Sequence, residues 1–93
     1  MAPKTRFTNL DEFYAAVMQL IHWLGREGHQ GEARILDSIM HTAWTTSSEL
    51  LGELMLALRD MKGDYSPELR NEIDTCYEFA LHHRKILGST HGR

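Results

Sequence analysis

The chain has 93 residues, 42% of them hydrophobic, which is enough for one small globular domain, residues 1–93, with a modest core. Its formal net charge of −3 excludes the dense basic surface that nucleic-acid binding requires. We expect neither a signal peptide nor a membrane span, because no apolar run reaches the necessary length. Cys76 is the only cysteine, so we expect a cytoplasmic protein without an internal disulfide.

The first predicted helix covers residues 9–26. Asn9 and Glu12 have the spacing of a capping box, in which an N-terminal side chain accepts a backbone hydrogen bond. Gly25 and Gly28 favour an end to this helix, because glycine readily adopts the left-handed backbone of a helix C-terminus. Between the two signals, apolar residues recur at helical spacing: Leu10, Phe13, Tyr14, Val17, Leu20, Ile21 and Leu24.

The segment from residue 31 to residue 62 has two interpretations, which predict different bundles. A quartet of threonine and serine contains a second capping box, Thr46 with Glu49, and predicts two helices at 31–44 and 47–62. A stripe of residues spaced four and three apart runs through the quartet and favours one helix over 31–62. That helix would be about 48 Å long, far longer than its neighbours. We favour the break, which fits a monomer, whereas continuity fits a dimer.

Ser66 and Pro67 mark the clearest helix start, because serine caps the backbone and proline suits the first helical position. A fourth helix is predicted over 66–87, and the chain ends, residues 1–7 and 89–93, are expected to be flexible. Short connections favour antiparallel neighbours. The expected fold is therefore all-α, a small antiparallel bundle of four helices (9–26, 31–44, 47–62 and 66–87), with a three-helix version containing 31–62 as the alternative.

Several large apolar residues fall outside the sides that these helices turn toward the core. With 100° per residue, Trp23 lies among polar residues of the first helix, and Leu56 lies opposite the core side of the third. Phe79 and Ile86 widen the apolar side of the fourth helix. Large apolar residues of this kind are typical of interface centres, although wide faces on a small bundle explain them as well. We therefore predict a non-catalytic protein–protein interaction module, a homodimer, with Trp23, Leu56, Phe79 and Ile86 as interface candidates.

The charge is concentrated in the middle of the chain. Residues 27–78 carry eleven acidic and four basic side chains, a net charge of −7. Such a segment usually serves solubility, but it also attracts basic partners. The alternative function is therefore a small acidic inhibitor or antitoxin-like protein that covers a basic surface of another protein.

Two carboxylate–histidine pairs motivate a third function, a metal-dependent helical-bundle enzyme. Asp37 with His41 and Glu78 with His82 are each spaced i, i+4, so the members of each pair share one side of a helix. Both pairs are expected to face solvent, and their spacing differs from the Glu-x-x-His motif of di-iron bundles. We therefore expect no cofactor, no metal and no catalytic residue.

Overall fold

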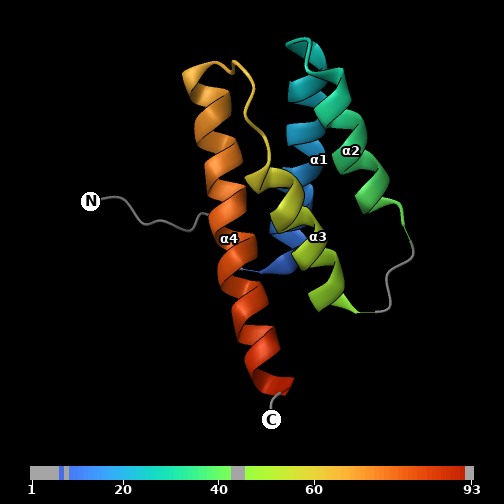
Figure 1. Ribbon diagram of the computed structural model, residues 1–93, viewed down its shortest axis with the longest axis vertical. Helices are drawn as coiled ribbons and strands as arrows, with labels where there is room; N and C mark the ends of the chain where they lie inside the picture. Colours follow the sequence, from blue (N-terminus) through green and yellow to red (C-terminus); the bar gives the residue numbers. More distant parts are fainter. Residues whose placement is uncertain (1–6, 8, 43–45, 92–93) are drawn as a thin grey trace.

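The computed structural model describes residue 7, residues 9–42 and residues 46–91, with side chains up to residue 83. These residues form an all-α bundle of four helices and no strand, as predicted (Figure 1). The helices are α1 (Leu10–Arg26), α2 (Gln30–Met40), α3 (Ser47–Arg59) and α4 (Pro67–His91).

The chain breaks at the quartet, and the single-helix interpretation of residues 31–62 is wrong. Thr46 has an extended backbone, and its hydroxyl accepts a 3.1 Å hydrogen bond from the Glu49 N–H, so that α3 begins at Ser47. This is the capping box that the sequence predicts. α2 ends at Met40, before the predicted residue 44, as the chain runs into β-branched residues that disfavour the helix. Residues 43–45 lie outside the described part.

The turn between α1 and α2 is closed by a Schellman motif. Gly28 has a φ of 89°, which is accessible to glycine at little cost. The N–H groups of Gly28 and His29 donate to the carbonyls of Gly25 and Leu24, at 3.3 and 2.8 Å. The predicted Asn9 cap also forms, because its side chain accepts a 2.9 Å hydrogen bond from the Glu12 N–H.

The ends of α3 and α4 differ from the predicted ends. α3 stops at Arg59 instead of residue 62, and the chain turns so that Met61 enters the core. α4 begins at Pro67 as predicted but continues to His91, past Gly88 and into the segment expected to be flexible. Glycine permits a helix end without forcing one, and inside a helix it costs only about 1 kcal/mol.

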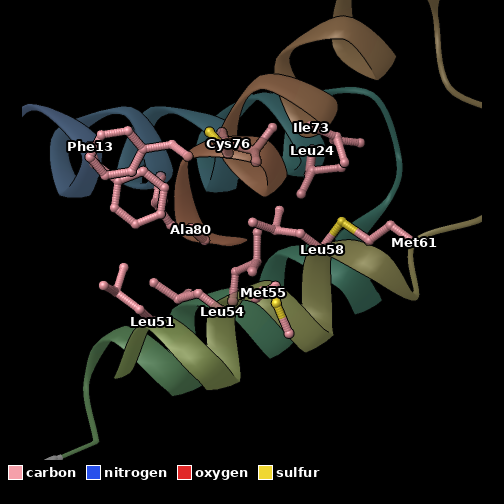
Figure 2. Close-up of a cluster of buried hydrophobic side chains, with 14 of the residues drawn as sticks. Phe13, Leu24, Leu51, Leu54, Met55, Leu58, Met61, Ile73, Cys76 and Ala80 are labelled. Atoms are coloured by element: carbon pink, nitrogen blue, oxygen red, sulfur yellow. The ribbon is translucent and has the colours of Figure 1, made fainter. Parts of the chain in front are cut away.

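The core takes side chains from all four helices and, among the described residues, contains no polar or charged side chain. Leu54 and Leu58 extend from α3 toward the side of α4 that carries Ile73 and Cys76 (Figure 2). Phe7, expected within a flexible lead, packs edge-on against the rings of two core phenylalanines, at 5.9 and 5.3 Å between centroids. The other residues of that lead, 1–6, and residues 92–93 lie outside the described part. The buried residues are Phe7, Phe13, Val17, Leu20, Leu24, Ala33, Leu36, Leu51, Leu54, Met55, Leu58, Met61, Leu69, Ile73, Cys76, Phe79 and Ala80.

The helices form a ring in which α1, α2, α3 and α4 each pack on the next and α4 closes on α1. Within the described part, the backbone of α2 does not come close to that of α4, nor the backbone of α1 to that of α3. α3 packs most extensively on α4 and α2 on α1, so α2 and α3 are the least closely joined neighbours. The C-termini of α1 and α3 and the N-termini of α2 and α4 lie near one another, at one end of the bundle. The candidate site lies at this end.

Candidate functional site

An open groove of about 400 Å³ lies where the first turns of α2 meet the last turns of α3. Its size is in the range of sites that accept a small molecule or a few side chains. Apolar atoms make up most of the surface that it presents. We call it the α2–α3 groove, and its lining residues are Gly31, Glu32, Ile35, Ala57, Asp60 and Met61.

Two aliphatic side chains beside this groove are exposed to solvent. Ile35 lines the groove and is 54% exposed, and Leu56 is 38% exposed. Among the described side chains they are the only large hydrophobic ones so exposed. Leu56 lies one helical turn before Asp60 on the same side of α3, so it lies at the outer edge of the groove. Burial of either side chain against a partner would remove apolar surface from water, at roughly 25 cal/mol per Å².

The charged groups that line the groove are two carboxylates, one on each wall. Glu32 extends from α2, and one of its oxygens, Oε2, accepts a 3.2 Å hydrogen bond from the Tyr65 hydroxyl. Asp60 caps the end of α3, and its Oδ1 lies 3.3 Å from Nε of Arg59. The side chain of Asp60 is 67% exposed, so this neighbouring pair contributes little to stability.

A polar network, which we call the end cluster, holds the chain ends together behind the groove. The Glu27 carboxylate accepts a 2.8 Å hydrogen bond from Trp23 Nε1 and a 3.2 Å hydrogen bond from the Ser66 hydroxyl. The Arg70 guanidinium donates a 2.9 Å hydrogen bond to the Met61 carbonyl. The end cluster therefore links α1 to the start of α4, and the start of α4 to the segment that leaves α3.

Tyr65 joins the end cluster to the groove. Its ring lies 4.6 Å from the His29 ring, and its hydroxyl reaches Glu32 of the groove wall. The Arg70 guanidinium lies 5.8 Å from the centre of the Tyr65 ring, within range of a cation–π contact. Burial raises the pKa of Tyr65 above its ordinary value, and the negative charge of Glu32 acts in the same direction. Tyr65 thus orients a groove carboxylate from behind.

Three of the four interface candidates from the sequence have described side chains, and these lie in different environments. Trp23 is half-buried against the core and bonded to Glu27, so it acts in the end cluster. Phe79 is only 4% exposed and stacks on Phe13 at 4.8 Å between centroids, so its ring is unavailable to a partner in this structure. Leu56 is exposed as expected. Ile86 belongs to α4, but its side chain lies outside the described part.

The structure does not bring the two carboxylate–histidine pairs together. On α2, Nδ1 of the exposed His41 lies 3.2 Å from Oδ1 of Asp37, whereas Glu78 and His82 are exposed on α4, whose backbone does not come close to that of α2. Within the described residues, no three histidine, cysteine, aspartate or glutamate side chains are grouped to hold a metal ion. Asp37 and His41 therefore form a local i, i+4 surface contact that is separate from Glu78 and His82.

Sequence reasoning missed Ile35, Glu32 and Tyr65. Ile35 carried a usable signal, because it falls about 100° away from the buried Leu36 on the helix and so lies outside the stripe facing the core. No comparable signal marked Glu32 or Tyr65, since they meet only after the chain has folded over 33 positions.

Comparisons with known proteins do not place the chain in a family. No protein-family model, curated protein or solved structure compared with it matches. In the described part of the chain, no helix has both the length and the apolar content needed to cross a membrane. A functional proposal therefore rests on the groove and on the residues around it.

Proposed function

We propose that this protein is a non-catalytic helical interaction module that docks another protein in the α2–α3 groove. The observation that carries the proposal is Ile35, a large aliphatic side chain 54% exposed at an apolar groove. Solitary exposed apolar residues are common, but exposure beside an apolar concavity is typical of docking sites. A partner side chain in the groove would bury Ile35 and complete the contacts between α2 and α3.

The lining of the groove supports docking better than chemistry. Two carboxylates and several apolar side chains suit the packing of a partner side chain and the recognition of its flanking groups. Cys76, the only thiol, is buried in the core, where it packs as a small hydrophobic residue. A chain with one cysteine also supports a reducing compartment, and we propose the cytoplasm.

Self-association is the second candidate form of this function. Leu56 favours it, because its exposure on the shoulder of α3 extends the apolar surface beyond the groove. In a two-fold dimer the same surface on each copy would meet its counterpart, so one patch would serve both partners. The mass of a cross-linked product separates this form from binding to a different protein.

Site-specific photocross-linking in the source cells tests the proposal. A photoreactive amino acid replaces Ile35 or, in a second variant, Leu56, and the control carries it at Gln19, which is exposed on α1. We expect one discrete adduct from positions 35 and 56 and none from position 19. An adduct of twice the chain mass of 10.7 kDa identifies a second copy, and any other discrete mass identifies a different partner. No adduct above the Gln19 control would overturn the proposed function.

A further inference from the structure

We infer that the occupant of the α2–α3 groove is a cationic amphipathic helix of another protein. An apolar side chain of that helix packs between Ile35 and Ala57, and a lysine or arginine on its flank meets Glu32 and Asp60. This inference rests on the proposed function and adds to it the chemistry of the partner. It belongs to the helix-in-groove class of recognition, in which two neighbouring helices accept a third.

Charge complementarity is the first argument. The two walls of the groove each contribute one charged residue, and both residues are acidic. An apolar side chain entering from a neutral or acidic helix would bring no counter-charge to these carboxylates, whereas a flanking cation would pair with both walls. The surrounding sequence reinforces this preference, since residues 27–78 carry a net charge of −7 and attract a basic segment before contact.

The position of Glu32 is the second argument. Its Oε2 accepts a hydrogen bond of 3.2 Å from Tyr65, whose ring is packed against His29. A carboxylate oriented in this way loses less conformational freedom when it binds a cation than a freely rotating one. Hydrogen bonds between a cation and a carboxylate are about twice as strong as neutral ones, so a held Glu32 is a good anchor.

The small apolar area argues for a single helix and against a second copy. Stable interfaces between folded proteins bury about 800 Å² on each partner. Here Ile35 and Leu56 are the only described large apolar side chains with such exposure, and the groove that Ile35 lines is about 400 Å³. A second copy would also bring its own acidic groove, with Glu32 and Asp60 of both chains at close range.

Binding of two synthetic peptides tests the inference. One peptide has leucine at helical spacing flanked by lysine, and its match has glutamate in place of lysine. Fluorescence anisotropy of the labelled peptide gives the dissociation constant for the full-length protein at low and high salt. We expect the lysine peptide to bind and to weaken with salt, because screening reduces the attraction, and we expect the glutamate peptide not to bind.

Charge-neutral variants locate the binding site. The double variant Glu32→Gln, Asp60→Asn should weaken binding of the lysine peptide by about tenfold, since two charge pairs are lost while the shape is kept. Glu68→Gln with Glu78→Gln removes the same charge from exposed positions on α4 and should change binding by less than about twofold. Ile35→Ser should also weaken binding by about tenfold. Circular dichroism and urea unfolding of each variant verify that the fold is kept.

Three results of the peptide measurements would overturn the inference. The first is no binding of the lysine peptide, and the second is equal binding of the two peptides. The third is an equal loss of peptide affinity in the groove double variant and the α4 double variant, because this would show attraction to the whole acidic surface. A photocross-linked adduct of two copies at position 35 would also overturn it while leaving the proposed function intact. Conversely, if the lysine peptide binds in the groove but no adduct forms in cells, the inferred preference for a cationic helix would stand and the proposed function would be refuted.

Discussion

The Ser66 hydroxyl at the start of α4 donates a 3.2 Å hydrogen bond to the carboxylate of Glu27 at the end of α1, 39 positions earlier. The same hydroxyl accepts a 3.3 Å hydrogen bond from the Leu69 N–H, so the cap of α4 and the contact with α1 share one atom. Glu27 also brings its negative charge to the positive end of the α4 dipole. This carboxylate therefore stabilises both the helix start and the packing of α4 on α1.

Replacement of Glu27 by alanine should lower the free energy of unfolding by about 1 kcal/mol, because Trp23 Nε1 and the Ser66 hydroxyl lose their acceptor. Urea unfolding followed by circular dichroism measures the change. Glu78→Ala, at an exposed site of α4, is the matched control and should change stability by less than about 0.5 kcal/mol. Equal losses in the two variants would show that the contact of Glu27 with α4 has no energetic role.

Gly63→Ala should also destabilise the protein by about 1 kcal/mol. A Cβ at this position would lie 2.9 Å from Cζ of Tyr65, so the ring must move and give up its hydrogen bond to Glu32. In a Tyr65→Ala background the same substitution should be nearly neutral, which a double-mutant cycle measures. Gly25→Ala is the control, since its Cβ would meet nothing within 4 Å. There we expect a gain of about 0.5–1 kcal/mol from helix propensity.

Alanine substitution of Phe79 and of Leu56 should cause different losses of stability, because one side chain lies in the core and the other on the surface. Phe79→Ala should cost about 3–5 kcal/mol, because the ring is 4% exposed and leaves a cavity beside Phe13. Leu56→Ala should cost about 0.5 kcal/mol or less, since the side chain is 38% exposed. Thermal unfolding of both variants provides the comparison. Similar losses at the two positions would contradict the assignment of Phe79 to the core.

Stability should fall at alkaline pH because of two tyrosines. Burial raises the pKa of Tyr14 and of Tyr65 above 10.0 in the folded protein. A raised folded-state pKa means that the contribution of each phenol is present below the unfolded pKa of about 10 and is lost as the pH rises through the folded value. Unfolding free energies measured between about pH 8 and pH 12 should show this fall. A Tyr14→Phe, Tyr65→Phe double variant should show a shallower one, and an unchanged slope would contradict the assignment.

Tyr14 adds a second expectation to this series. Its hydroxyl is enclosed and has no well-formed hydrogen bond among the described residues, although the nearby Ser47 hydroxyl partly offsets the effect of burial on its pKa. A buried hydroxyl without a partner is unfavourable. Tyr14→Phe alone should therefore leave the unfolding free energy at neutral pH unchanged or raise it, as measured by urea unfolding.

The starts of α1, α3 and α4 could be predicted from the sequence, because a cap depends on residues three positions apart, whereas α2 begins without a side-chain cap. Asn9, Thr46 and Ser66 all cap as their spacing predicts. The ends could not be predicted equally well, since packing between helices decides them. Arg59 ends α3 because Met61 enters the core, and α4 passes through a glycine that could have ended it.

The candidate site was only partly predictable for a related reason. An ideal helix gives the angle of each side chain but not which neighbour covers it. The helical angle placed Phe79 beside the core-facing side of α4. In the structure the ring of Phe7, which belongs to a segment with no helical pattern, packs against it. Ile35 became part of a groove only because α3 passes beside the first turns of α2. Leu56 was found because it lies nearly opposite the core, where no neighbour could cover it.

In the described part of the chain, the core consists of apolar side chains alone, and this affects where local unfolding begins. Contacts among aliphatic and aromatic groups have no preferred direction, so they allow a helix to slide or rotate by small steps. The directional contacts of Glu27, Glu32 and Arg70 are all found at one pole of the molecule and prevent such steps there. Amide hydrogens near that pole should therefore exchange with solvent more slowly than those at the opposite pole, and local melting should begin at the far end.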